Sequence, residues 1–227
     1  MSELQPHEPS APGATGLSMR TGAILVVFTV AFTTVMALTY RATKEPIEAS
    51  AQAEKLNLIG EVLPRALYDN ALLDDRIMIP PTPELGLDQA SAVYRARKGG
   101  APAALVLEAA APDGYSGRID LLLAVAASGE VIAVRVTRHK ETPGLGDYID
   151  IRKDKHKDRP WITQFNGKGF AQVPAGEWHV RKDGGRFDQV AGATISARAV
   201  TNAVGRALRF AVDNERRLFA APGSAPS

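Results

Sequence analysis

An uncharged apolar stretch near the beginning of this chain limits how it can fold. Residues 21–40 (TGAILVVFTVAFTTVMALTY) contain no charged side chain and are preceded by Arg20. A helix of this length covers about 30 Å, the thickness of the hydrocarbon core of a bilayer. A core helix of a soluble protein rarely contains so long an uncharged run, and the apolar region of a signal peptide is commonly about 7–15 residues long. The pattern predicts a retained single-pass transmembrane helix over residues 20–41.

The charges that flank this stretch do not fix its orientation. Arg20 precedes it, whereas Arg41 and Lys44 follow it. By the positive-inside rule this count would place the C-terminal bulk in the cytoplasm. Glu45 and Glu48 follow directly, however, and large domains translocate regardless of such small differences. Composition therefore leaves the side of the membrane open.

The composition excludes several kinds of site. The 227 residues include no cysteine, which excludes disulfides, thiolate nucleophiles and cysteine-held zinc or iron–sulfur centres. The formal charge of +2 provides no strong field for nucleic acid, so no nucleic-acid partner is expected. No metal site is expected either, because the histidines are scattered and only His139 and Glu141 form a close pair. Redox chemistry here would need an organic cofactor or a cysteine-free metal site.

The remaining chain divides into two tails, a linking helix and one folded domain. Residues 1–19 are polar with Pro, Ser and Gly, and residues 220–227 are rich in Ala, Pro and Ser, so both are expected to be disordered. Residues 44–64 carry a rough apolar stripe that is opened by Pro46, which predicts a membrane-proximal helix. The domain is expected over residues 65–219.

Short apolar runs separated by turn residues predict that this domain is α+β, with mainly antiparallel strands and flanking helices. Residues 90–96 and 103–109 are expected to be strands. The clearest hairpin joins residues 118–127 to residues 131–137 through a turn at residues 128–130.

A loop region and a final helix are expected to complete the domain. Residues 147–176 are polar and Gly-rich, which predicts mostly loop with short helical pieces, anchored by Trp161 and Phe165. A helical period then begins near Ser196, the expected N-cap. Its apolar face contains Ala197, Val200, Val204, Ala207, Leu208 and Ala211.

The first segment with candidate chemistry, residues 188–196 (DQVAGATIS), lies directly before this helix. Gly192 and Ala193 are small enough for the backbone to approach a ligand closely. Thr194 places a hydroxyl at a helix start, where free N–H groups and the helix dipole favour a phosphate. A simple helix cap, with Thr194 or Ser196 satisfying backbone donors, is the alternative.

The second segment, residues 139–147 (HKETPGLGD), follows the predicted hairpin. Pro143 fixes its own φ, while Gly144 and Gly146 permit a tight turn with little side-chain bulk. Such a loop can lay its backbone against a flat ring. An ordinary surface turn is the alternative interpretation.

The segment before the last helix is similar to the flavinylation motif of the FMN-binding domain family. In that motif, Asp-x-x-(Ser/Thr)-Gly-Ala-Thr, a flavin transferase joins FMN to the last threonine through a phosphoester. Residues 188–194 match it except at Ala191, where the family usually has Ser or Thr. A second Gly-Ala-Thr ends at Thr15, but it has no acidic residue before it and lies across the membrane segment, so Thr15 is expected to be unmodified.

Other blocks resemble one branch of this family, the G subunit of the Rnf ion-translocating electron-transport complex. They are APDGYSG at residues 111–117, ETPGLGD at 141–147 and WITQFNGK at 161–168. With the anchor first and the flavinylation motif last, the resemblance spans about residues 20–218. The C subunit of the sodium-translocating NADH:quinone reductase shares the flavin domain. The Gly-Leu-Gly-Asp that ends the second segment at Asp147, together with the moderate length of the chain, favours the Rnf protein.

The resemblance implies a cofactor and the residues that bind it. Thr194 would carry FMN through a phosphoester, as a substrate of the transferase rather than as a catalytic nucleophile, so the chain is expected to have no catalytic residue and no independent activity. The residues implied to surround the cofactor are Asp188, Gly192 and Ala193 in the first segment, Glu141, Thr142, Leu145 and Gly146 in the second, and Tyr115 and Ser116 in the block before the hairpin.

The resemblance also implies a place in the cell and a role. The chain would be anchored in the bacterial inner membrane, with its N-terminal tail in the cytoplasm and its domain in the periplasm. It would relay electrons between other subunits of a membrane complex that couples electron transfer to ion translocation. A scaffold or assembly protein without flavin is the alternative, for which Ala191 is the main reason.

Overall fold

The computed structural model describes residues 14–222, and the chain divides into two units at Glu54 and Lys55. The predicted tails fall largely outside the described residues. Residues 14–19, expected to be disordered, instead begin helix α1 (Ala14–Val62). At the other end Ala220 ends helix α2 (Thr194–Ala220), and Ala221 packs against the core of the domain.

The first unit consists of the N-terminal part of α1. Its stretch Met19–Lys44 has a mean hydropathy of 2.1 and exposed side chains throughout, and it is long and apolar enough to cross a membrane. The hydroxyls of Thr29 and Thr34 donate to the carbonyls of Leu25 and Val30, so these polar side chains find partners inside the helix. The apolar segment is therefore suited to the membrane anchor that the sequence predicts.

Helix α1 is continuous, whereas the sequence predicts one helix over residues 20–41 and a second over residues 44–64. It runs through Pro46 and ends at Val62, two residues before Pro64. A proline inside a helix removes one hydrogen bond and costs about 3 kcal/mol, but the loss is confined to one turn and the backbone bonds on both sides remain. The helix ends before Pro64, as predicted, because a proline makes helical backbone unfavourable for the residue that precedes it.

The second unit is built on a five-stranded antiparallel sheet in the order β1-β2-β3-β4-β5, which confirms the predicted α+β fold. The strands are β1 (Arg76–Ile79), β2 (Ser91–Lys98), β3 (Ala101–Gly114), β4 (Gly117–Ala126) and β5 (Val131–Arg138). Strands β4 and β5 form the predicted hairpin. Strand β1, only four residues long, was not predicted.

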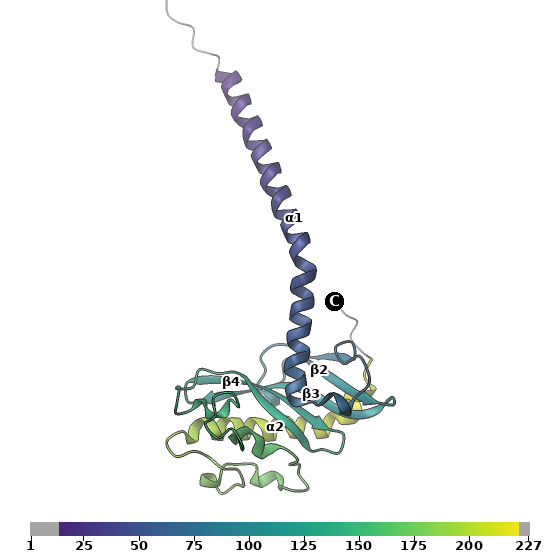
Figure 1. Ribbon diagram of the computed structural model, residues 1–227, viewed down its shortest axis with the longest axis vertical. Helices are drawn as coiled ribbons and strands as arrows, with labels where there is room; N and C mark the ends of the chain where they lie inside the picture. The colour runs from purple at the N-terminus through teal and green to yellow at the C-terminus, as the bar shows by residue number, and fades with distance from the viewer. Residues whose placement is uncertain (1–13, 223–227) are drawn as a thin grey trace, which may run out of the picture. The chain divides into compact units, whose positions relative to one another are not determined.

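The two faces of the sheet are covered by the two helices (Figure 1). The last turns of α1 bury Ile59, Val62 and Leu63 against one face. Helix α2 covers the other face with the expected apolar stripe, whose six side chains are all buried. The expected anchors Trp161 and Phe165 are also buried there, among the short 3-10 helices of residues 147–183.

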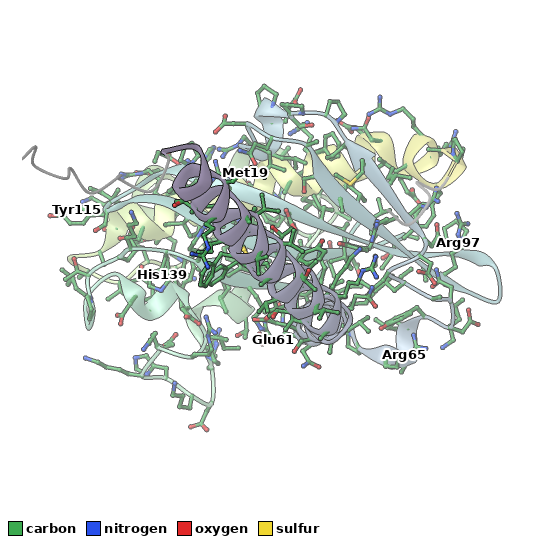
Figure 2. All side chains as sticks on the ribbon, turned by 90° about the horizontal axis from the view of Figure 1, so that it is seen from above. Met19, Glu61, Arg65, Arg97, Tyr115 and His139 are labelled. Carbon is green, nitrogen blue, oxygen red and sulfur yellow. The ribbon has the colours of Figure 1, made fainter. Side chains whose placement is uncertain are left out.

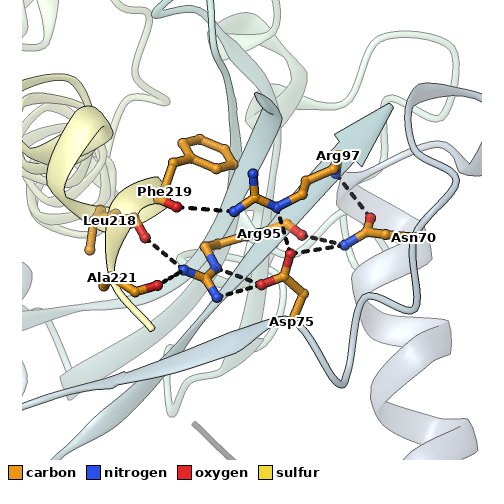
Figure 3. A network of polar contacts seen from close by, with 7 residues as sticks. All are labelled: Asn70, Asp75, Arg95, Arg97, Leu218, Phe219 and Ala221. Carbon is orange, nitrogen blue, oxygen red and sulfur yellow. Dashed lines mark hydrogen bonds and ion pairs between the residues drawn. The ribbon is translucent and has the colours of Figure 1, made fainter. Parts of the chain in front are cut away.

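Two arginines on β2 bind the C-terminal end of α2 (Figure 3). Arg95 is 3% exposed and donates to the carbonyls of Leu218 at 3.1 Å and Ala221 at 2.5 Å. Arg97 donates to the carbonyl of Phe219, and both guanidinium groups bind the carboxylate of Asp75. They satisfy carbonyls that a helix end leaves without intrahelical partners. This end of the domain lies opposite the end that carries Tyr115 (Figure 2).

Candidate functional site

The N-terminal end of α2 is shaped by a tight turn that only glycine adopts readily. Gly192 has φ of +88°, in the left-handed region, and the N–H of Ala193 donates to the carbonyl of Val190. Helix α2 then begins at Thr194, with Ala193 as its N-cap, and no side chain of residues 14–222 caps its first N–H groups. The first turn therefore presents donors without intrahelical partners.

The expected N-cap role of Ser196 is wrong. Ser196 is the third residue of α2 and is fully buried, and its Oγ donates to Oε2 of Glu141 at 2.5 Å. The cause is the helical period, since Ser196 precedes Val200 by four residues and so lies on the same buried face. That spacing was the signal in the sequence that could have revealed its role.

Glu141 connects three parts of the site. Its carboxylate is buried, and Oε1 accepts from the N–H of Ser116 at 3.0 Å while Oε2 accepts from Ser196. Ser116 lies in the two-residue turn between β3 and β4. Glu141 thus links this turn and the loop after β5 to the start of α2, where the helix dipole favours a carboxylate.

The loop of residues 141–147 is the tight turn that the sequence predicts. The carbonyl of Thr142 accepts from the N–H groups of Leu145 and Gly146 at 3.1 and 3.0 Å. Gly144 has φ of +76°. A Cβ on Gly146 would lie 2.9 Å from Oε2 of Glu141, so only glycine fits at this position without displacing the carboxylate.

These elements enclose a recess of about 110 Å³. Seven of the predicted site residues line it: Tyr115, Glu141, Thr142, Leu145, Gly146, Gly192 and Ala193. Ile195 and Ser196 complete the lining and were not among the predicted residues. The structure thus brings together segments that lie far apart in the sequence.

The other three predicted residues lie around the recess rather than in its lining. Ser116 contributes its backbone N–H to Glu141. Thr194 is half-buried at the first position of α2. Asp188 is exposed, and its carboxylate forms an ion pair with Arg181 at 3.0 Å. Its backbone carbonyl accepts a 2.6 Å bond from Nε1 of Trp161, which anchors the start of the motif.

Tyr148 supports the turn before α2. Its hydroxyl donates to the carbonyl of Ala193 at 3.2 Å and accepts from the N–H of Val190 at 3.4 Å. Burial raises the pKa of Tyr148 to about 12, with smaller contributions from the charges of Asp154 and Glu141, while the bond from Val190 acts in the opposite direction. Tyr148 therefore stays neutral over the ordinary pH range.

The residues at the recess suit a flat ring that carries a phosphate. Tyr115, Leu145 and Ile195 leave 66%, 46% and 44% of their surfaces exposed, which forms an apolar rim. The uncapped first turn of α2 is suited to an anion. Ligand pockets usually have volumes of roughly 300–1,000 Å³, so a ring would lie across this recess rather than inside it.

Comparison with known proteins identifies both parts of the chain. Residues 114–209 match the FMN-binding domain family, and residues 18–62 match the RnfG N-terminal region. The chain is 40% identical over 202 residues to the G subunit of the ion-translocating oxidoreductase complex of Pseudoalteromonas atlantica, covering 89% of this chain and 92% of that protein. It is 41% identical over 208 residues to the G subunit of Pseudomonas aeruginosa, covering 91% and 95%.

The chain belongs to this G-subunit family. The FMN-binding match includes every residue that lines the recess, from Tyr115 to Ser196. The RnfG N-terminal match ends at Val62, where α1 ends. The division of this family member into an apolar helix and an FMN-binding domain thus confirms the resemblance found in the sequence.

Proposed function

We propose that this chain is the membrane-anchored flavoprotein component of an ion-translocating electron-transport complex. FMN joined to Thr194 by a phosphoester would relay electrons between other subunits of the complex. The observation that carries this proposal is the position of Thr194 at the uncapped start of α2, directly after two residues that line the recess. When bound, FMN supplies the electron-transfer chemistry, and the protein supplies position and electrostatics.

The start of α2 has the properties that a phosphoryl group requires. Its first N–H groups have no side-chain cap, and no hydrogen-bond partner of the Thr194 hydroxyl occurs within residues 14–222. The helix dipole favours negative charge at this end. A phosphoryl group on Thr194 would therefore meet free backbone donors without displacing an existing side-chain contact.

The shallow recess gives a physical reason for a covalent link. A flavin ring lying across about 110 Å³ of hollow keeps much of its surface in water, so apolar burial holds it only weakly. A phosphoester to Thr194 removes dissociation altogether. If the domain lies in the periplasm, as the resemblance implies, this would prevent loss of the cofactor into a compartment that does not replace it.

Maturation of this protein would require a separate flavin transferase, as the resemblance to the FMN-binding family implies. In that reaction Thr194 would be the modified hydroxyl. Glu141 and Ser196, whose side chains are buried and bonded to each other, would hold the acceptor helix in place. Neither of these two residues would itself be oxidised or reduced in the electron transfer that follows.

In-gel fluorescence of the denatured protein tests the proposal. The full chain, co-expressed with a flavin transferase, should give a fluorescent band that persists in Thr15→Val and is lost in Thr194→Val. If the wild-type chain gives no band while Ala191→Ser does, Ala191 blocks modification and the scaffold interpretation is correct. A band that persists in Thr194→Val would place the flavin elsewhere.

The proposed location can be tested separately because the chain contains no cysteine. Lys182 is exposed, so Lys182→Cys provides a single reporter on the domain. We expect a reagent that crosses the outer but not the inner membrane to label it in intact cells. Labelling that occurs only after lysis would place the domain in the cytoplasm.

A further inference from the structure

A basic loop lies beside the candidate flavin site. Residues 152–159 (RKDKHKDR), here called the basic loop, contain five Lys or Arg residues and two Asp residues. The loop connects two 3-10 helices, Asp147–Ile149 and Trp161–Phe165. The first of them begins at the end of the turn of residues 141–147, here called the glycine-containing turn. One end of the loop therefore follows the turn that lines the recess, and the other is tied through Trp161 to Asp188, at the start of the segment before α2.

Two buried carboxylates hold the basic loop in a defined conformation. Asp150 binds the N–H and the guanidinium of Arg152. Asp154, only 2% exposed, accepts from the N–H groups of His156 at 2.8 Å and Trp161 at 2.6 Å. Burial would raise the pKa of Asp150, but the contacts with Arg152 outweigh it and hold this pKa below its usual value. Asp150 is thus charged at neutral pH in the folded protein and keeps its bonds to the start of the loop.

Three cations of the loop border a cavity of about 350 Å³ that adjoins the recess. Lys153, Lys155 and Arg159 line this cavity, and Leu145 and Gly144 of the glycine-containing turn line it as well. Leu145 also lines the recess. The cavity and the candidate flavin site therefore share a wall.

The three cations do not pair with the acids that line the same cavity. Within residues 14–222, none of Lys153, Lys155 and Arg159 forms an ion pair. Of the acids that line the cavity, Asp147 accepts from Gly144, Asp154 accepts from two backbone N–H groups, and Asp188 binds Arg181. Bonds from neutral N–H groups leave Asp147 and Asp154 charged, so the surplus of positive charge belongs to the loop itself, in which five Lys or Arg residues accompany only two Asp residues.

We propose that the basic loop is the docking surface for an acidic protein that exchanges electrons with the flavin. This inference rests on the proposed function, since it gives the site its redox partner. Exchange would move one electron between the partner's redox centre and the flavin, leaving one oxidised and the other reduced, without forming a bond. Docking at this loop would bring the partner to the Leu145 side of the recess.

An acidic protein fits this surface better than a small anion does. Lys153, Lys155 and Arg159 are exposed, and a single exposed ion pair contributes little affinity in water. A surface with several carboxylates would meet several such cations at once. Complementary charge of this kind mainly sets the orientation of the two proteins and accelerates their association. The association rate rises by about 10- to 1,000-fold at low salt.

Binding is measured first, with oxidised ferredoxin as the acidic probe. The Thr194→Val chain in detergent carries no flavin under the proposed function, so its affinity for the probe reports docking alone. We expect Lys153→Glu/Lys155→Glu to weaken binding at low salt by about tenfold or more, and added salt to abolish the difference. Equal affinity in both proteins would overturn the proposal.

The matched control makes the same charge change at the opposite end of the domain. Lys98 follows Arg97, which contacts the C-terminal end of α2, and Arg216 lies about 33 Å along α2 from Thr194. Lys98→Glu/Arg216→Glu should bind the probe as the parent does. An equal loss in this control would mean that net charge, not the basic loop, determines binding.

Reduction of the flavinylated full chain then tests the functional consequence. Reduced ferredoxin should reduce the flavin of Lys153→Glu/Lys155→Glu about tenfold more slowly than that of the wild type at low salt, whereas a small neutral reductant should act equally on both. A wild-type chain without flavin fluorescence would refute the proposed function but leave the binding result intact. Lipid binding is the remaining outcome. If Lys153→Glu/Lys155→Glu loses only its binding to anionic phosphatidylglycerol vesicles, while reduced ferredoxin reduces its flavin as fast as that of the wild type, the loop contacts lipid and the proposal is wrong.

Discussion

Ser196 donates a hydrogen bond to Glu141 from inside the first turn of α2, and both side chains are buried. This contact joins the helix that carries Thr194 to the loop of residues 141–147. The other oxygen of Glu141 binds the turn between β3 and β4. One carboxylate thus fixes the relative positions of three segments that line or border the recess.

Ser196→Ala should therefore destabilise the domain. The substitution leaves a buried carboxylate oxygen without its partner, which typically costs about 1.5–3 kcal/mol of the free energy of unfolding. Urea unfolding followed by the fluorescence of Trp161 and Trp178 measures it. Thr201→Val is the control, because the buried Thr201 hydroxyl on the same helix has no partner within the described residues, and its removal should be neutral or stabilising.

Gly146→Ala should disturb the same contact from the opposite side. The new Cβ would lie 2.9 Å from Oε2 of Glu141 and 3.1 Å from Oγ of Ser196, so the carboxylate must move. We expect lower stability together with a smaller fraction of flavinylated protein in the fluorescence assay. Gly176→Ala, where no atom of the described residues beyond the adjoining ones lies within 4 Å of the added carbon, should change neither. Normal flavinylation of Gly146→Ala would show that the position of Glu141 is unimportant for modification.

Alkaline pH should weaken the domain through Tyr148. Its pKa is raised to about 12 in the folded protein, so the unfolded chain, with an ordinary value near 10, releases this proton first. The contribution of Tyr148 is fully present below about pH 10 and is lost as the pH rises towards 12. The difference in the free energy of unfolding between the wild type and Tyr148→Phe should shrink over this interval. A constant difference from about pH 8 to about pH 12 would contradict the assigned shift.

Arg95→Met should be among the most destabilising single changes. Arg95 is buried and binds Asp75 and the last carbonyls of α2, so its loss leaves several polar groups unpaired, at a cost of about 3–5 kcal/mol. Arg186→Met breaks a solvent-exposed pair with Glu177 and should have little effect. Similar losses in the two variants, compared by urea unfolding, would show that the Arg95 network contributes no more than a surface ion pair.

The parts of the fold that follow local rules were predictable from the sequence. The hairpin of β4 and β5 contains a turn at Gly129, which has positive φ, and the face of α2 follows from its apolar period. The 141–147 turn follows from its proline and glycines. In each case the residues that determine the element lie within it.

The parts that depend on distant contacts were not predictable. Ser196 resembles an N-cap in the sequence, and only the position of Glu141 explains why it faces inward instead. The pairing of Arg95 with residues 123 and 126 positions away leaves no local pattern. Pro46 was also misleading for a different reason. It predicts the start of a new helix, yet α1, 49 residues long, runs through it with the loss of one backbone hydrogen bond.

Mass spectrometry of one tryptic peptide shows directly whether Thr194 carries FMN. Trypsin should release residues 187–198 (FDQVAGATISAR), which contain Thr194 and no other threonine, from the protein produced with its flavin transferase. We expect this peptide to gain the mass of FMN less one water, with fragmentation placing the addition on Thr194. The N-terminal peptide with Thr15 should be unmodified. Recovery of the 187–198 peptide only in its unmodified form, under conditions in which the transferase is active on a known substrate, would show that Thr194 is not the site of flavin attachment.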